Sequence, residues 1–237
     1  MIQPPDDAAR RGAFAAMMAH ELRTPLTAAF GALEMMSRAA ASPAGGRDAV
    51  LIDLAHRNTH RLLRIVEDCL DLEAASDGRL TLDRERVEPG EIVALGVDGA
   101  RSTREQTGID VMLQLDARGS ITGDRPRLGR ALAHLVRNAV TFAPPGTVVT
   151  VATTDDPERG MVRFVVEDHG VGIEPEQCRA LFQRFDVRDA AGRRRVGGLG
   201  LGLAYVRMVA EEHRGAVAVR AQPGCTRIAF EVPAVGS

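Results

Sequence analysis

The sequence predicts an α+β protein, in which a helical hairpin precedes an α/β sandwich domain with a mostly antiparallel mixed sheet. Two observations predict this order. Over residues 12–76, apolar residues recur at intervals of three and four, the period of an amphipathic helix. After residue 80, short runs rich in β-branched residues alternate with helical stretches. We expect domains at 12–76 and 80–235, with Gly78 of "SDGRL" as the break between them.

The first domain reads as two long helices joined by a short loop. "ASPAGG" (41–46) interrupts the helical period with a proline and two glycines. The apolar stripes are Phe14, Met17, Met18, Leu22, Leu26, Ala29, Leu33 and Met36, then Leu51, Leu54, Asn58, Leu62, Ile65, Cys69 and Leu72. Two such helices form an antiparallel hairpin. Each helix has apolar residues for more than one neighbour, so we expect two hairpins to form a dimeric four-helix bundle.

The second domain alternates strands with helices. The predicted strands are "VVTVATT" (148–154), "MVRFVVED" (161–168), "AVAVRA" (216–221) and "TRIAFEV" (226–232). The predicted helices lie near residues 90–107, 126–142 and 201–213. This succession favours an α/β domain with a mostly antiparallel sheet.

The composition indicates a soluble globular protein, with 45% hydrophobic and 26% charged residues. A formal net charge of -2 argues against a nucleic-acid or membrane-surface partner. Cys69, Cys178 and Cys225 are odd in number and far apart, so they predict buried free thiols rather than a metal or disulfide pattern. With no apolar run of membrane-spanning length and no signal peptide, we expect a cytoplasmic location.

The stretch "MAHELRTPL" starts at Met18 and carries the first candidate site. At 100° per residue, His20 lies about 200° around the helix from Met18, so it faces away from the apolar stripe. Glu21 follows it directly, and Thr24 lies one turn further on the same face. Pro25 removes the backbone N–H that would bond to the carbonyl of Glu21. Taken alone, an exposed His-Glu pair most often has no function.

Three later motifs together suggest a nucleotide site. They are "RALAHLVRNAVTFAP" (130–144) with Asn138, "VEDHGVGIEPE" (166–176) with Asp168, Gly170 and Gly172, and "GGLGLGLAYVRMVAEEHRG" (197–215) with Gly197, Gly198, Gly200 and Gly202. Glycines at a helix start let the backbone approach phosphates and direct free N–H groups at them. Each motif alone is weak evidence, but their order is specific.

With these motifs in place, the sequence resembles the catalytic core of sensor histidine kinases of two-component systems. The resemblance covers roughly residues 14–233 and extends to the ATP-binding domain shared with gyrase, heat-shock chaperones and mismatch-repair proteins. "AHELRTPL" resembles the histidine box, "GDRPRLGRALAHLVRNAVTFAPPG" the asparagine box, "EDHGVGI" and "GGLGLGLAYV" the two glycine boxes, and "LFQRFD" the phenylalanine box. "RLLRIVEDCLDLEAASDGRL" (61–80) is similar to the second bundle helix and its exit.

The resemblance implies a role for each matching residue. His20 is the implied phospho-acceptor, and Glu21 the implied general base. Asn138 is implied to hold Mg²⁺, and Asp168 to accept a hydrogen bond from the adenine amino group. The further nucleotide-binding positions implied are Phe142, Gly170, Gly172, Phe182, Phe185, Gly198, Gly200, Gly202 and Leu203.

The resemblance therefore implies an ATP-dependent autophosphorylating histidine kinase. It would form a homodimer and pass phosphate from His20 to an Asp of a response regulator receiver domain. Residues 1–12 are too short for a sensor, and neither a receiver domain nor a membrane span is present. We expect either an excised core or a small soluble kinase that takes its signal from an upstream sensor domain or protein.

Two alternatives stay open on the sequence. Glu21 to Thr24 resembles the family's E-x-x-T phosphatase pattern, in which Thr24 orients a water against the regulator's phospho-Asp. The competing structural interpretation is that the Thr24 hydroxyl only donates a hydrogen bond to the backbone of its own helix near Pro25. The second alternative is a non-catalytic phosphotransfer or scaffold protein of the same fold. A degenerate protein of that kind should lose Asn138, Asp168 or the glycines, and all are present.

The sequence departs from the family pattern at several positions. Thr141 stands where many members carry a Lys, and Arg193–Arg195 either replace that charge or form a solvated basic loop. His134 occupies the position of the water-activating Glu of the related ATPases, which favours transfer to His20 over hydrolysis. The alternative is that His134 has no catalytic significance and is a simple residue of the helix surface.

Two further departures lie in the first glycine box and at the start of the last strand. For His169, inside that glycine box, we expect a packing or solvent role. "PGCT" (223–226) is contracted against the family's usual Gly-x-Gly-Thr, which should affect sheet packing more than chemistry.

Overall fold

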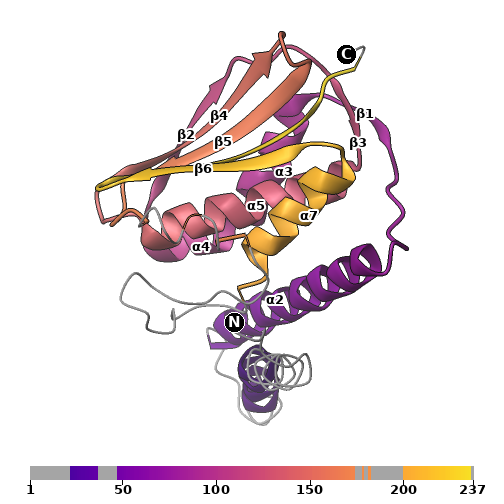
Figure 1. Cartoon of the computed structure of the whole chain (residues 1–237). Coiled ribbons are helices and arrows are strands. Elements are labelled where there is room, and N and C mark those ends of the chain that lie inside the picture. The colour runs from indigo at the N-terminus through magenta and orange to yellow at the C-terminus, as the bar shows by residue number, and fades with distance from the viewer. Residues whose placement is uncertain (1–21, 37–46, 174–177, 179–180, 183–199, 236–237) are drawn as a thin grey trace, which may run out of the picture. The chain divides into compact units, whose positions relative to one another are not determined.

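The computed structural model describes residues 22–36, 47–173, 178, 181–182 and 200–235. The chain divides into two compact units, one made mainly of residues 1–71 and the other of residues 72–195 and 200–237 (Figure 1). The predicted stripe residues Phe14, Met17 and Met18 and the predicted "ASPAGG" loop lie outside the described residues.

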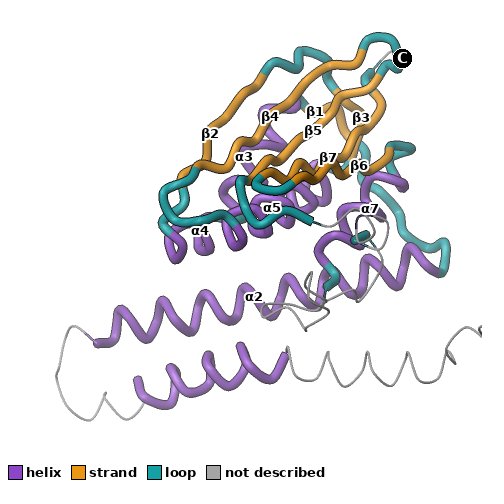
Figure 2. Tube along the Cα trace, turned by 60° about the vertical axis from the view of Figure 1, so that its left-hand side comes forward, coloured by secondary structure: helices purple, strands orange, loops and turns teal. Residues whose placement is uncertain are grey.

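The described residues of the first unit lie in helix 22–36 and in the long helix α2 (Arg47–Ser76) (Figure 2). The division between the units falls within α2, after Asp71. The best-buried apolar side chains of the unit, Ala29, Ala32 and Ala55, are all small, and small side chains let helix backbones approach closely. The stripe predicted for α2 is confirmed as its less exposed face, because each of its residues is buried or half-buried.

Large apolar side chains of the same unit are nevertheless exposed. Leu26 and Leu33, predicted for the buried stripe, are 59% and 55% exposed, and Phe30 between them is 66% exposed. On α2 the exposed apolar residues are Val50, Ile52, Leu63, Val66 and Leu70. One hairpin offers each helix a single neighbour, so these side chains stay outside its interior.

Helix α2 ends where the sequence predicts a break. Its last residue is Ser76, and Gly78 has a positive φ of 64°. The N–H of Gly78 donates to the carbonyl of Ala75 (3.0 Å), and the N–H of Arg79 donates to that of Ala74 (2.8 Å). This left-handed glycine satisfies carbonyls that the helix end leaves without an intrahelical partner.

The second unit is built on a five-stranded sheet in the order β2-β4-β5-β7-β6. Its strands are β2 (Asp110–Leu115), β4 (Val148–Asp156), β5 (Met161–Asp168), β6 (Ala216–Gln222) and β7 (Cys225–Pro233). Only β2 and β4 pair in parallel, which confirms the mostly antiparallel mixed sheet. A separate antiparallel pair joins β1 (Glu85–Val87) to β3 (Ile121–Gly123). The edge strand β2 was not predicted.

Helices cover one face of the sheet: α3 (Pro89–Gly99), α4 (Arg101–Thr107), α5 (Arg125–Phe142) and α7 (Gly202–Glu212) (Figure 1). Burial alternates along β5, so that Val162, Phe164 and Val166 lie beneath the helices. Phe164 stacks on Phe230 of β7 at 4.8 Å between ring centroids. Side chains such as Leu132 of α5 complete a core without water access.

The helical stretch predicted near 90–107 consists of two helices. α3 ends at Gly99 and α4 begins at Arg101. The carbonyl of Gly99 accepts a hydrogen bond from Arg137 Nη1 of α5 (2.9 Å), and a Cβ on Gly99 would lie 2.9 Å from that of Ala133. Packing against α5 thus decides the break. Among the residues described, no helix has the length and apolar character needed to cross a membrane.

Candidate functional site

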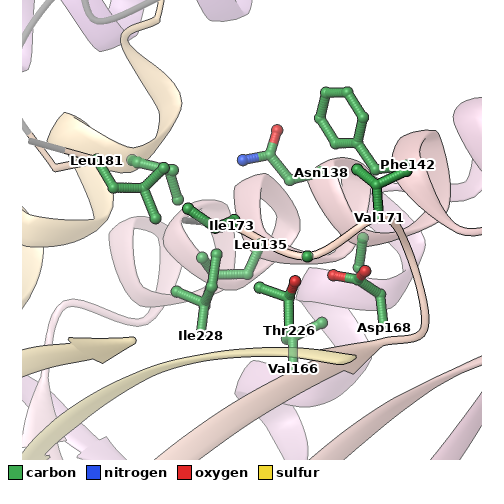
Figure 3. A pocket seen from close by; sticks show the side chains of 13 residues that line it. Leu135, Asn138, Phe142, Val166, Asp168, Val171, Ile173, Leu181, Thr226 and Ile228 are labelled. Carbon is green, nitrogen blue, oxygen red and sulfur yellow. The ribbon is translucent and has the colours of Figure 1, made fainter. Parts of the chain in front are cut away.

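A pocket lies in the second unit, between α5 and the adjoining ends of β5 and β7 (Figure 3). Its walls are mainly apolar, and its polar side chains are Asn138, Asp168 and Thr226. The full lining is Leu135, Asn138, Ala139, Phe142, Val166, Asp168, Val171, Gly172, Ile173, Leu181, Leu203, Thr226 and Ile228. An apolar pocket with a few converging polar groups is the usual form of a small-molecule site.

Asp168 supplies a buried carboxylate on the sheet side of this pocket. It ends β5, is only 8% exposed, and its Oδ1 accepts the N–H of Gly170 (2.9 Å). Thr226, which is also buried, is its partner across the β5–β7 ladder. Figure 3 shows the two side chains near each other beside Val166. A carboxylate and a hydroxyl among apolar walls suit a flat, apolar ligand that carries a hydrogen-bond donor.

Two glycines let the loop after β5 pass close to its neighbours. A Cβ on Gly170 would lie 2.7 Å from the carbonyl oxygen of Phe142 and 2.8 Å from Oδ1 of Asp168. Gly172 has φ of 81°, and a Cβ there would lie 2.7 Å from the carbonyl oxygen of Gln222. Larger residues would therefore push the loop away from α5 and from the β6–β7 turn.

Helix α5 carries the other polar contact of the pocket. Asn138 and Phe142 are one turn apart, so both project from the same face of the helix. Asn138 is half-buried, and Phe142 is partly exposed. Figure 3 shows both side chains on the helix side of the pocket, opposite Asp168 and Thr226. An amide oxygen at this position is a ligand that a hard cation prefers.

His213 fixes the start of α5 against the end of α7. Its Nε2 accepts the N–H of Asp124 (2.9 Å), so its Nδ1 is the protonated nitrogen and donates to the carbonyl of Val209 (2.7 Å). Burial lowers the pKa of His213 and keeps the ring neutral. Burial alone would raise the pKa of Asp124, but hydrogen bonds from Arg127 and Asp83 outweigh it and lower that pKa.

His134 lies where α5 meets the start of α7, which corrects its reading as a simple helix-surface residue. It is half-buried, its Nδ1 lies 3.1 Å from Nη2 of Arg137, and its ring lies 5.3 Å from that of Tyr205. A Cβ on Gly202 would lie 2.8 Å from the same Nδ1. Thr141, at the family's Lys position, donates from its hydroxyl to the carbonyl of Arg137 (2.6 Å).

Many of the predicted site residues come together in the second unit. Five line the pocket: Asn138, Phe142, Asp168, Gly172 and Leu203. The N–H of Gly170 donates to Asp168. Gly200 precedes α7 and Gly202 begins it. Buried Phe182 follows the lining residue Leu181. Thr24 is exposed on helix 22–36 of the first unit. His20, Glu21, Phe185, Gly198 and Arg193–Arg195 lie outside the described residues.

Sequence reasoning missed Thr226 and most of the apolar walls. Thr226 belongs to the quoted "PGCT" turn, but only the ladder register places it opposite Asp168, 58 residues earlier (226 − 168). Val166 could have been predicted, because it lies two residues before Asp168 and therefore on the same face of β5. The apolar lining residues that were not predicted are Leu135, Ala139, Val166, Val171, Ile173, Leu181 and Ile228.

Cys69, Cys178 and Cys225 are not joined in disulfides, as predicted, but each is half-buried rather than fully buried. Partial burial, together with the nearby carboxylate of Glu167, raises the pKa of the Cys225 thiol. Cys225 is therefore a protonated thiol at neutral pH in this structure.

Comparisons with known proteins agree with this geometry. The family described as "His Kinase A (phospho-acceptor) domain" matches residues 10–78, and "Histidine kinase-, DNA gyrase B-, and HSP90-like ATPase" matches residues 123–236. The circadian input-output histidine kinase CikA of Synechococcus elongatus is 32% identical over 222 residues, which cover 91% of this chain and 29% of CikA.

Two solved structures are also similar. The mycobacterial sensor histidine kinase MprB is 32% identical with a TM-score of 0.54, over 64% of this chain and 97% of the MprB chain. Full-length ShkA, in complex with AMPPNP, is 25% identical with a TM-score of 0.65, over 94% of this chain and 46% of the ShkA chain. The chain spans between about a quarter and about half of the length of the curated relatives it matches.

Proposed function

The chain belongs to the sensor histidine kinases, and on that premise we propose that it is the catalytic core of an ATP-dependent autophosphorylating kinase. It transfers phosphate from ATP to His20 and then to an Asp of a response regulator receiver domain. The observation that carries the proposal is the buried Asp168 beside Thr226 in an apolar pocket, with a glycine loop packed against it.

ATP suits this pocket on its adenine side. The carboxylate of Asp168 accepts a hydrogen bond from the exocyclic amino group, while apolar walls such as Ile228 and Leu135 contact the ring. Gly170 cannot carry a side chain without displacing Asp168. The AMPPNP bound to the similar kinase ShkA supports an adenine nucleotide as the ligand.

The phosphate side calls for a cation and backbone donors. Asn138 offers one amide oxygen, and Mg²⁺ commonly takes one or two protein ligands while phosphates and waters complete its shell. When bound, Mg²⁺ neutralises phosphate charge during transfer. Gly200 precedes α7 and Gly202 begins it, and glycines at a helix start let backbone N–H groups approach phosphates. Asn138 therefore fits the Mg²⁺ that the resemblance implies.

The acceptor step falls to the histidine motif. One ring nitrogen of His20 attacks the γ-phosphorus, a P–N bond forms, and the bond to the bridging oxygen breaks as ADP leaves. Glu21 takes the proton from the other ring nitrogen. The support for these roles is the motif itself and the phospho-acceptor family match over residues 10–78. In this proposal the domain of residues 12–76 carries the phospho-acceptor His20, and the domain of residues 80–235 carries the nucleotide site.

A second activity, dephosphorylation of the regulator, is favoured by the exposure of Thr24. A hydroxyl on this exposed residue, four positions after His20 in the sequence, can orient a water toward a docked phospho-Asp.

The kinase is proposed to act as a homodimer. Leu26, Phe30 and Leu33 on the first helix and five apolar residues of α2 are exposed in a single chain. A second hairpin would bury them in a four-helix bundle. We keep the cytoplasm as the proposed location, because ATP and response regulators meet the kinase there.

The experiment that tests the function is incubation of the chain with γ-labelled ATP and Mg²⁺. We expect acid-labile, base-stable label in the wild type, none in His20→Gln, and undiminished label in the matched control His56→Gln, which removes an exposed histidine of α2. Asn138→Asp should lose labelling through weakened nucleotide binding. Full labelling of His20→Gln would reject the acceptor, and absence of label from wild type would reject the kinase.

A further inference from the structure

A second cluster of chemically reactive side chains lies behind the nucleotide pocket. Glu167, His169 and Cys225 each offer one ligand atom, and these three atoms lie within 4.8 Å of one another. Asp168 pairs with Thr226 across the β5–β7 ladder, and both of these side chains face the pocket. Because side chains alternate along a strand, Glu167 and Cys225 project from the opposite face of the sheet.

The spacing of the cluster is close to that of a metal site. Cys225 Sγ donates to Oε1 of Glu167 at 3.7 Å, and His169 Nε2 lies 4.0 Å from the same oxygen. Tetrahedral Zn²⁺ with bonds of about 2.0–2.3 Å holds its ligand atoms about 3.5 Å apart. The side chain of His169 is 48% exposed, so it is free to rotate over the remaining distance.

We propose that Glu167, His169 and Cys225 form a Zn²⁺ site on the outer face of the sheet, with water as the fourth ligand. Thiolate, imidazole and carboxylate are the ligand types that zinc takes, whereas Mg²⁺ and Ca²⁺ take oxygen alone. On binding, the ion replaces the thiol proton between Sγ and Oε1, and that proton passes to solvent. One thiolate and one carboxylate then balance the two charges of the ion.

Arg227 prepares Glu167 for this role. Its Nε donates to Oε2 of Glu167, so the carboxylate is held with Oε1 directed at Cys225 and His169. Partners of this kind orient a metal-binding carboxylate, and their loss commonly lowers metal affinity about 10- to 100-fold.

The position of the site links it to the nucleotide pocket. His169 follows Asp168 in the loop after β5, and Cys225 precedes Thr226 in β7. An ion bound to both joins the loop that carries Asp168 to the strand that carries Thr226. Metal binding and ligand binding should therefore change each other's affinity by the same factor. This coupling, unlike the metal site itself, rests on the proposed nucleotide function.

Cobalt titration of the full chain tests the site, because Co²⁺ bound to a thiolate gives a charge-transfer absorption band that imidazole or carboxylate ligation does not give. We expect one equivalent of Co²⁺ to produce the band and Zn²⁺ to abolish it. Cys225→Ser should remove the band, and Arg227→Ala should weaken binding about 10- to 100-fold. Cys69→Ser and Cys178→Ser, matched controls, should keep it.

A second surface histidine pair requires its own control. His56 and His60 on α2 have Nε2 atoms 3.1 Å apart, and such a pair binds metal without a thiolate. The double variant His56→Gln/His60→Gln should therefore keep the charge-transfer band. Zn²⁺ should raise the melting temperature of this double variant, and it should not raise that of the double variant when Cys225→Ser is added.

These measurements test the metal site and its coupling to the nucleotide pocket separately. No band in the wild type, or a band that survives in Cys225→Ser, overturns the metal site. For the coupling, adenosine is the probe because it has no phosphates to chelate Zn²⁺. Equal adenosine affinity with and without Zn²⁺, in a protein that shows the band, overturns the coupling alone. Failure to bind adenosine or ATP under either condition contradicts the proposed function and leaves the metal site standing.

Discussion

Replacing Asp168 by Asn tests the nucleotide pocket with the smallest change of shape. The Asn oxygen can still accept the N–H of Gly170, which Oδ1 accepts now at 2.9 Å, so the loop should keep its fold. The other oxygen becomes an NH₂ group, and a donor then faces the adenine amino donor in a buried site. Losing a buried acceptor of this kind costs about 1–3 kcal/mol.

The cost converts to a weakening of ATP binding of about 5- to 150-fold, which titration calorimetry resolves directly. Inosine triphosphate sharpens the test, because its ring carries an acceptor where adenine carries the amino group. Wild type should prefer ATP, and Asp168→Asn should narrow or reverse that preference. Gly90→Ala in α3, where a Cβ meets open space, serves as the control variant. Unchanged ATP affinity in Asp168→Asn, with an unchanged melting temperature, would refute the assignment of the adenine site.

Gly170→Ala should weaken ATP binding at least about tenfold in calorimetry, because its Cβ would lie 2.7 Å from a backbone oxygen; wild-type affinity would contradict this. Burial lowers the pKa of His213 in the folded protein, so the contribution of this residue to the free energy of unfolding is complete above pH 6.5. Below pH 6.5 the free energy of unfolding falls, because the unfolded chain binds a proton that the buried ring does not. His213→Gln keeps an acceptor for the N–H of Asp124, so it should reduce the loss of stability at low pH, measured as the denaturant midpoint at a series of pH values. The same pH dependence in wild type and variant would exclude His213 as the cause of that loss. Thr24→Ala should spare self-phosphorylation and slow dephosphorylation of the cognate regulator roughly 10- to 100-fold; equal rates with one regulator preparation would leave Thr24 structural. Residues 12–76 should give a dimeric mass in light scattering, and a monomer at tens of micromolar would count against the bundle.

Local pattern was sufficient to predict much of the nucleotide-binding unit. Strand β5 alternates buried and half-buried residues over its whole length, and α5 has a continuous apolar face, so both were found from period alone. Edge strand β2 is exposed at five of its six positions, and its parallel partner β4 is distant in sequence. Its pairing is therefore a tertiary effect that no short-range period reveals.

In the candidate site, too, residues that are close in sequence were predictable and residues brought together by the tertiary fold were not. Asn138 and Phe142 share a helix face, and Asp168 and Gly170 share a turn, so each pair was recognisable within a few residues. Thr226 enters the pocket only through the register of two strands. His134 is drawn into the contact between α5 and α7 by the absence of a side chain at Gly202. Spatial neighbours of this kind have no signature in the chain segment that contains them.

The central claim is that phosphate from ATP ends on His20, and mapping the modified residue tests it most directly. The chain is incubated with ATP and Mg²⁺, digested with trypsin under alkaline conditions and analysed by mass spectrometry. The tryptic peptide of residues 12–23 contains a single histidine, His20. We predict one added phosphate on that peptide, lost on brief acid treatment and absent when Asn138→Asp replaces the wild type. Phosphate on another peptide, or acid-stable phosphate on this one, would contradict the assignment.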